Sequence, residues 1–347
     1  MKITVIGCGA WGMAIASHLA KQGHSVTVWA HSEAEAERLT KEREMPNAFP
    51  GVRFPDGITF VNDRRAAADA GEDLLVFAVA SPFTRSTAES FKEAIGTGKR
   101  ITIVTKGIEE ETLMTQADIL EDVLPGNTIG VLSGPTHAEE VILGMPTTIV
   151  SASKSRQLAE FVQDVFISPM LRVYTSPDVL GVELGGSLKN VIALAAGMAD
   201  GLGYGDNCKA ALITRGIHEI TKLAVRMGAL PVTLQGLSGM GDLIVTCASM
   251  HSRNRRAGIL IGQGKSMEEA MAEVGQVVEG VYSAKAAKAL SQKYDTPLPI
   301  IEEVNRVLFE GESAEEAVRK LMMRDRKMES NFRPEDLPEC WRTGSSR

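Results

Sequence analysis

Short apolar runs alternate with amphipathic segments through the first half of the chain. Seven of the runs have the length of strands: KITVIG, SVTVWA, GITFV, DLLVFAVA, RITIVTKG, TIGVLSGP and PTTIVSA. Segments of helical length separate them, and strands that alternate with helices are typical of a mainly parallel sheet covered on both faces. The pattern therefore predicts an α/β domain over residues 1–177.

The pattern changes beyond about Pro177. No further β-rich run follows, and helical periodicity continues from DVLGVELGGSLKN to AEEAVRKLMMRD. We therefore expect an all-α second domain over residues 178–330. Residues 331–347 are polar and contain proline, which predicts a loosely held tail.

Composition limits the classes of function. The 347 residues suffice for two domains, and 44% hydrophobic with 23% charged residues is typical of a soluble globular protein. The net charge is −7 and no long Lys/Arg block occurs, which argues against a nucleic-acid partner. An anionic ligand would therefore need a local pocket.

The cysteines and the apolar runs predict the compartment. The four cysteines lie far apart and form no C-x-x-C pair, so the sequence predicts neither a zinc site nor a disulfide framework. The first residues enter a strand pattern without the features of a signal peptide, and no uncharged apolar run of membrane-spanning length occurs. We expect a cytoplasmic protein with no bound metal and no membrane span.

A glycine fingerprint follows the first predicted strand. Gly7, Gly9 and Gly12 form G-x-G-x-x-G at the opening of a helix. In a βαβ unit the first glycine permits a tight turn, the second lets the backbone approach a pyrophosphate, and the third allows close packing of helix and strand. The free N–H groups of the helix N-terminus attract the anion. This context predicts a Rossmann-like dinucleotide-binding domain.

The end of the second predicted strand leaves the choice of cofactor open. An NAD-binding unit usually places Asp or Glu there to hold the ribose hydroxyls, whereas this chain has His31 and Ser32, with Glu33 one step further. No acid repels a 2′-phosphate at the strand end, and no arginine selects it. NAD and NADP therefore both remain candidates.

A second candidate anion site lies in GLSGMGDLIVTCASMHSRNRRAG. Asp242 follows a glycine-rich turn, and Ser252, Arg253 and Asn254 form a cluster whose planar guanidinium, hydroxyl and amide suit phosphate oxygens. Taken alone, the cluster also fits a solvated helix start. We expect Arg256 on the solvated side of the helix that follows.

Lys189 lies in an otherwise small and apolar helical segment. Burying an ammonium without a partner is costly, so this lysine either faces solvent or has a functional partner. Gly185 and Gly186 precede it by four and three residues and share its helical face. We interpret the two glycines as space through which a ligand reaches Lys189.

Together these motifs resemble those of a known family. The segments GCGAWGMA, TKGIE, LSGPTHAEEV, GGSLKNVIALAAGMADGLGYGDN, GLSGMGDLIVTC, HSRNRRAG and QVVEGV are similar to those of the bacterial-type NAD(P)-dependent glycerol-3-phosphate dehydrogenases. The resemblance covers roughly residues 2–325. The family often has serine in place of Ala10 and a basic residue in place of Ser32, so the preference between NAD and NADP stays open.

The resemblance implies a role for each matching residue. It implies that Lys189 is the proton donor and acceptor. It implies that the substrate contacts Lys106, Gly134, Thr136, Lys189, Asp242, Ser252, Arg253 and Asn254. It implies that the cofactor contacts Ala10, Trp11, His31, Lys106, Ala138, Arg253, Val277 and Glu279, besides the fingerprint glycines Gly7, Gly9 and Gly12.

The implied reaction interconverts dihydroxyacetone phosphate and sn-glycerol 3-phosphate, which supplies phospholipid synthesis. An ammonium at the C2 oxygen stabilises the developing charge and donates a proton, and the neutral amine removes that proton in the reverse direction. Lys106 adds positive field nearby. Asp242 accepts a hydrogen bond from a substrate hydroxyl or from a lysine ammonium.

Two other functions fit parts of the sequence. A dehydrogenase with the same two-domain plan but a carboxylate or sugar-acid substrate would also use the Ser-Arg-Asn cluster, and a substrate screen separates the two. A redox sensor would bind NADH without turnover, but it would need neither Lys189 nor the second anion site. The Gly/Ala-rich helical domain is also of a kind that often packs against a copy of itself, so a homodimer is one expected arrangement.

Overall fold

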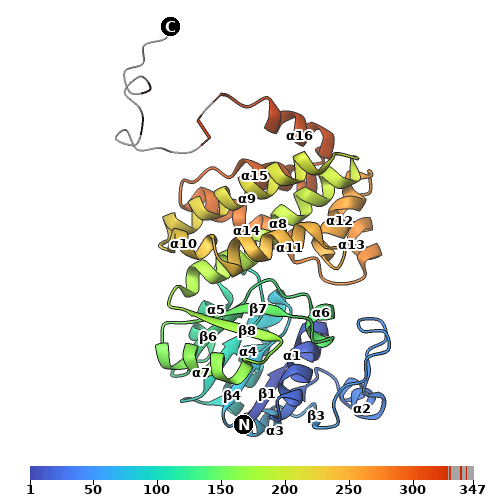
Figure 1. Cartoon of the computed structure of the whole chain (residues 1–347), viewed down its shortest axis with the longest axis vertical. Coiled ribbons are helices and arrows are strands. Elements are labelled where there is room, and N and C mark those ends of the chain that lie inside the picture. Colours follow the sequence, from blue (N-terminus) through green and yellow to red (C-terminus); the bar gives the residue numbers. More distant parts are fainter. Residues whose placement is uncertain (327, 330–336, 338–340, 342–347) are drawn as a thin grey trace.

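The computed structural model describes residues 1–326, 328–329, 337 and 341, and the predicted tail over 331–347 lies almost wholly outside the described residues. A sheet domain and a helical domain are stacked along the long axis of the molecule (Figure 1). Every strand ends by Ser176, and every described element after it is helical. The α/β class followed by an all-α region is confirmed.

The sheet has eight strands in the order β3-β2-β1-β4-β5-β6-β7-β8. Neighbouring strands are parallel except β6 and β7, so the sheet is mainly parallel, as predicted. The bounds are β1 (Lys2–Ile6), β2 (Ser25–Trp29), β3 (Ile58–Val61), β4 (Leu74–Phe77), β5 (Arg100–Ile103), β6 (Thr128–Ser133), β7 (Thr147–Ser153) and β8 (Leu171–Ser176).

The sequence pattern missed β8. Leu171 and Val173 are buried, whereas Arg172 and Tyr174 between and after them are exposed. This alternation is that of an edge strand with one covered face, and β8 pairs only with β7. A search for continuous apolar runs passes over such a strand.

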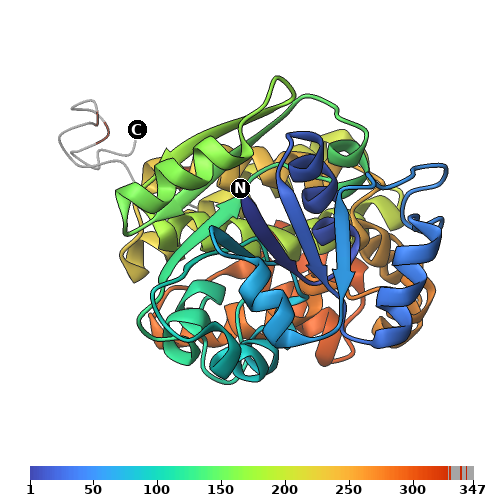
Figure 2. The same cartoon turned by 90° about the horizontal axis from the view of Figure 1, so that it is seen from below.

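Helices cover both faces of the sheet, as Figure 2 shows from below. One hydrophobic core joins the sheet to α1, α2, α6 and α7, and the other joins it to α3, α4 and α5. The bounds are α1 (Ala10–Lys21), α2 (Glu33–Glu42), α3 (Arg64–Ala70), α4 (Thr84–Ile95), α5 (Gln116–Val123), α6 (Ala138–Ile142) and α7 (Arg156–Phe166). The helices α1, α2, α3 and α6 begin within a few residues of the carboxyl end of the preceding strand, where ligands of such sheets gather.

The helical domain is built around α8 (Val179–Gly201). The other helices are α9 (Asp206–Met227), α10 (Pro231–Leu234), α11 (Asp242–Ala248), α12 (Arg253–Gly262), α13 (Met267–Val274), α14 (Glu279–Lys293), α15 (Pro299–Phe309) and α16 (Ala314–Met322). Among the described residues α8 alone has the length and apolar composition of a membrane span, and 89% of that window is buried inside the structure. It is therefore the core helix of this domain.

Glycines let α8 and α12 pack backbone against backbone. A Cβ on Gly197 would lie 2.2 Å from the carbonyl oxygen of Arg255, and one on Gly258 would lie 2.2 Å from that of Leu194. Larger side chains at either position would push the helices apart. The contact fixes the start of α12 beside the middle of α8, which brings Asn254 to Asn190.

Gly185 and Gly186 do not open a route for a ligand. A Cβ on Gly185 would lie 2.7 Å from the carbonyl oxygen of Ser238, and one on Gly186 would lie 2.8 Å from Oγ of Ser133. Protein atoms therefore fill the space beside both glycines. The expectation of a ligand path was wrong, because these glycines serve the contact of α8 with the π-helical turn η2 (Leu237–Gly241) and with the end of β6.

Candidate functional site

The glycine turn after β1 has the geometry that its fingerprint predicts. Gly7 has a φ of +118°, and a Cβ there would lie 2.6 Å from the carbonyl oxygen of Ala78. A Cβ on Gly12 would lie 2.2 Å from the carbonyl oxygen of Gly7. A Cβ on Gly9, in contrast, would have no atom within 4 Å. The turn is thus closed where helix and strands pack and open where a pyrophosphate approaches.

A cavity of about 890 Å³ lies between the sheet domain and the helical domain. Its walls come from the carboxyl ends of the strands, from the loop between α2 and β3, and from α8, α11, α12 and the start of α14. Most of the site residues expected from the sequence line it: Gly9, Ala10, Trp11, Lys106, Thr136, Ala138, Lys189, Asp242, Ser252, Arg253, Asn254, Val277 and Glu279.

Four of the expected residues lie outside the wall. Gly7 and Gly12 support the turn from behind, and Gly134 accepts a hydrogen bond from Lys106 through its carbonyl oxygen. His31 is exposed beyond the end of β2, where its ring meets that of Trp29 edge to face. The first three act through the backbone, while His31 lies at an exposed position that does not line the cavity.

Two lysines share one buried carboxylate at the centre of the cavity. Lys189 is 5% exposed and Asp242 is 1% exposed. Nζ of Lys189 donates to the carboxylate of Asp242 and, at 2.8 Å, to Oγ1 of Thr246. Nζ of Lys106 donates to the other carboxylate oxygen at 2.7 Å. Two ammonium groups and one carboxylate leave this centre with a net positive charge.

Burial lowers the pKa of Lys189 to about 7. The nearby charge of Lys106 lowers it as well, while the attraction of Asp242 raises it and opposes the effect of burial. His137 lines the same cavity, and its pKa is lowered by burial and by the charge of Lys189. A lysine whose pKa lies near neutrality can give and take a proton under ordinary conditions.

The Ser-Arg-Asn cluster combines a helix cap with a binding surface. Oγ of Ser252 caps α12 by accepting from the backbone N–H of Arg255 at 3.2 Å, so the helix-start interpretation is correct for this residue. Arg253 is exposed and lines the cavity. Asn254 is buried, and its Oδ1 accepts from the backbone N–H of Gly280 at 2.8 Å.

Arg256 is exposed, as expected, but its side chain also lines the cavity. It lies one turn after Ser252 on the first turn of α12, close to the phosphate-binding candidates. It therefore cannot serve as an inert comparison for Arg253.

Sequence reasoning assigned no role to two residues beside Lys189. Thr246 lies one turn after Asp242 on α11, and the i, i+4 spacing from that acid was the available signal. Asn190 accepts from Nδ2 of Asn254 at 2.9 Å. This bond joins α8 to the start of α12 across 64 residues of chain, a contact that no local pattern could reveal.

Glu279 links the helical domain to the sheet domain. Its Oε1 accepts from the backbone N–H of Ser81 at 3.5 Å, whereas its Oε2 is shielded from solvent and has no hydrogen-bond partner among the described residues. Burial raises the pKa of this carboxyl, and the charge of Arg253 lowers it. An unpaired carboxylate oxygen on a residue that lines the cavity fits the amide N–H groups of a nicotinamide.

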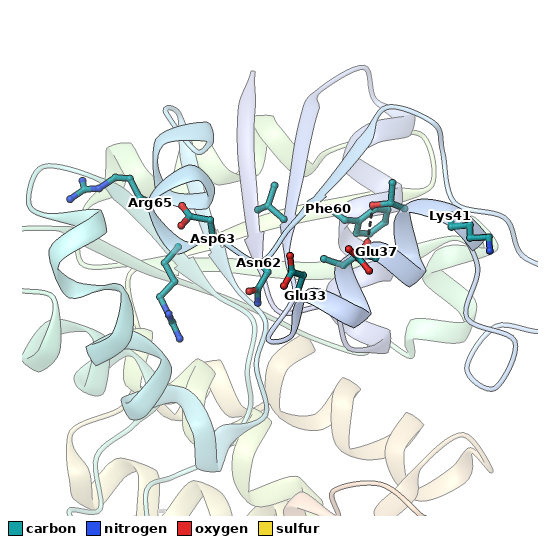
Figure 3. Close-up of a pocket in the computed structure, with 11 residues that line it drawn as sticks. Glu33, Glu37, Lys41, Phe60, Asn62, Asp63 and Arg65 are labelled. Carbon is teal, nitrogen blue, oxygen red and sulfur yellow. Dashed lines mark hydrogen bonds between the residues drawn. The ribbon is translucent and has the colours of Figure 1, made fainter.

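A second hollow lies on the outer edge of the sheet, beside α2 and β3. It is lined by residues of α2 and of the segment from Phe60 to Arg65. The charged side chains of Lys41 and Arg65 point away from each other and toward opposite sides (Figure 3). No group of three or more His, Cys, Asp or Glu side chains that could hold a metal occurs in the described part of the chain.

Comparison with known proteins points to one family over nearly the whole chain. Residues 2–159 match the N-terminal part of the NAD-dependent glycerol-3-phosphate dehydrogenases, and residues 178–319 match the C-terminal part. The glycerol-3-phosphate dehydrogenase [NAD(P)+] of Agathobacter rectalis is 58% identical over 94% of this chain and 97% of its own length. That of Bacillus subtilis is 48% identical over 93% and 94%.

A solved structure shares the whole architecture. The crystal structure of glycerol-3-phosphate dehydrogenase from Coxiella burnetii superposes with a TM-score of 0.89 at 34% identity and covers 93% of this chain and 98% of that one. Both domains and their stacking are therefore common to the two proteins.

Proposed function

This chain belongs to the NAD-dependent glycerol-3-phosphate dehydrogenase family, and we propose that it interconverts dihydroxyacetone phosphate and sn-glycerol 3-phosphate. The observation that carries the proposal is the buried centre of Lys189, Asp242 and Lys106 in the cavity between the two domains. A protein that only bound a dinucleotide would not need two lysines that share a buried carboxylate in this cavity.

When bound, the cofactor would supply a hydride as NAD(P)H in the reductive direction and accept one as NAD(P)+ in the oxidative direction. The open Gly9 of the turn, the free N-terminus of α1 and the unpaired Oε2 of Glu279 fit the cofactor, and we assign its binding to the lining residues from both domains. The chain's own contribution is to hold the substrate between this surface and Lys189.

Lys189 moves the proton. In its ammonium form it stabilises the charge that develops on the C2 oxygen during reduction and then donates a proton to that oxygen. Asp242 and Thr246 hold Nζ in place from one side. In the oxidative direction the neutral amine takes the same proton from the C2 hydroxyl.

The other residues bind and orient the substrate. Lys106, fixed by the carbonyl of Gly134 and by Asp242, adds a second positive charge near the reacting oxygen. Arg253 binds the phosphate with Ser252 and Asn254, so the phosphate, distant from C2, positions C2 against Lys189. Thr136 also lines the cavity.

The test is a substrate assay with the purified protein. Oxidation of NADH or NADPH should depend on dihydroxyacetone phosphate and should reverse with glycerol 3-phosphate and the oxidised cofactor. Turnover of a carboxylate or sugar acid in place of the phosphate ester would contradict the proposal. Binding of NADH without any turnover would support a sensor instead.

The lowered pKa of Lys189 predicts opposite pH profiles for the two directions. Reduction needs the ammonium, so kcat/KM for dihydroxyacetone phosphate should fall as pH rises through about 7. Oxidation needs the amine, so kcat/KM for glycerol 3-phosphate should rise over the same range. Initial rates from pH 5.5 to 9 check this, and profiles of the same shape in both directions would contradict it.

Ser32→Arg should lower KM for NADPH much more than KM for NADH. A guanidinium at this exposed position can pair with the 2′-phosphate, which NADH lacks. Oγ of Ser32 also caps α2 by accepting from the backbone N–H of Glu35 at 3.3 Å, so Ser32→Ala is the matched control for loss of the cap. Equal changes for both cofactors would place the adenosine ribose elsewhere.

We further propose a cytoplasmic enzyme that supplies glycerol 3-phosphate for phospholipid synthesis. Cys8, Cys208 and Cys247 are free thiols, which suits a reducing compartment.

We also propose that the two domains divide between residues 177 and 178 and that two copies of the chain form a homodimer through the helical domain. Light scattering coupled to size exclusion tests the dimer, and a monomer across the working concentration range would contradict it.

A further inference from the structure

Helix α2 carries two rows of charged side chains. Glu33, Glu37 and Lys41 follow each other at four-residue intervals and line the outer hollow (Figure 3). Arg38 instead lines the cavity between the domains. Its partners Glu35 and Glu42 lie three residues before it and four after it, and so share its face of the helix.

Both carboxylates of this second row hold Arg38. Nε and a terminal nitrogen of Arg38 donate to the two carboxylate oxygens of Glu35 at 3.0 and 2.9 Å, which is a bidentate pair. The other terminal nitrogen donates to Glu42 at 2.9 Å. The hydrogen bonds from Arg38 lower the pKa of Glu35, so the carboxylate is ionised at neutral pH. The guanidinium is thus occupied, and the three side chains together carry a net negative charge.

The cluster lies beside the glycine turn. The charge of Glu35 raises the pKa of the Cys8 thiol and that of Arg38 lowers it, after the larger effect of burial. Cys8 lies between the first two fingerprint glycines. The backbone N–H of Glu35 donates to Oγ of Ser32, which caps α2 shortly after the end of β2. Dinucleotide-binding folds hold the adenosine ribose between that turn and that strand end, and the ribose carries the 2′-phosphate that distinguishes NADP from NAD.

We propose that Glu35 makes this enzyme select NADH over NADPH by holding Arg38 in an ion pair at the adenosine end of the cavity. A 2′-phosphate would meet a cluster of like net charge, and the arginine fork that suits phosphate is already bound to a carboxylate. The ribose hydroxyls of NADH bring no such charge. This inference rests on the proposed function, which leaves the cofactor open.

The test compares the ratio of kcat/KM with NADPH to kcat/KM with NADH across variants. Glu35→Gln removes one negative charge and frees Nε and one terminal nitrogen of Arg38 from their carboxylate, while Glu42 still holds the other terminal nitrogen, so the ratio should rise about tenfold. Glu37→Gln is the matched control because it removes the same charge from the outer row of the same helix, and its ratio should stay within twofold of the wild type. A ratio for Glu35→Gln within twofold of the wild type, or an equal rise in both variants, would overturn the inference.

Arg38→Met separates recognition from a purely structural role. It leaves Glu35 and Glu42 without their cation, so the ratio should fall, opposite to the effect of Glu35→Gln. If both variants shifted the ratio in the same direction, the pair would only be holding α2 in place. Fluorescence titration with NADH and NADPH alone reads the same preference without substrate. A wild type that binds NADH but does not turn over dihydroxyacetone phosphate would therefore refute the proposed function and leave the inference testable.

Discussion

Lys189→Met should abolish turnover while cofactor binding stays nearly intact. Methionine keeps the length of the side chain and removes the ammonium. General acid–base catalysis is typically worth about 10²–10⁴-fold, and the same group also stabilises charge on the C2 oxygen, so kcat should fall by at least the top of that range. Single-turnover measurement of NADH oxidation with dihydroxyacetone phosphate gives the residual rate.

The fold should survive this change. Asp242 keeps the ammonium of Lys106 at 2.7 Å after the ammonium of Lys189 is lost, so no buried carboxylate is left without a cation. Lys222→Met, at an exposed position on α9, is the control and should retain wild-type kcat. A Lys189→Met enzyme with a tenth of the wild-type kcat would remove Lys189 from the mechanism.

Local patterns predicted the parts of the site that one segment can specify. The three glycines of the first turn lie where their spacing requires, because strand, turn and helix are consecutive in the chain. Lys189 was suspected from its chemistry alone, since a cation in a small apolar helix needs a partner. The structure supplies that partner from α11, 53 residues away.

Other features depend on contacts between distant segments. Gly185 and Gly186 suggested space for a ligand, but η2 and the end of β6 fill that space. Arg38 is only nine residues beyond the end of β2, yet its place in the cavity depends on which way α2 turns its faces. Single-segment periodicity gives the faces of a helix but not what each face meets.

The boundary between the two halves illustrates the same limit. The last strand, β8, ends at Ser176 and α8 begins at Val179, next to the predicted change at Pro177. The loss of apolar runs predicts the change at this point, but the strand just before it was missed because only one of its faces is covered. A search for continuous apolar runs finds strands that are covered on both faces more readily than edge strands with one exposed face.

Arg253→Ala should raise KM for dihydroxyacetone phosphate steeply. The exposed guanidinium lines the cavity beside the capped start of α12, and its loss leaves the bound phosphate underpaired. Truncating one partner of a charge pair that becomes buried on binding costs about 2 kcal/mol at the low end, which corresponds to about 30-fold in KM. Steady-state kinetics with saturating NADH measure the change.

Two comparisons decide what the loss means. Dihydroxyacetone has no phosphate, so it should be a poor substrate for both enzymes and should barely distinguish them. Arg226→Ala, at an exposed position near the end of α9, is the control for removal of a surface charge. Arg256 is unsuitable for this purpose because it lines the cavity. Some rise in KM for NADH is expected as well, since Arg253 also lies near Glu279. If Arg253→Ala left the kinetics of the phosphate substrate unchanged and lowered only the melting temperature, the residue would serve the helix start, and the phosphate would have to bind elsewhere in the cavity.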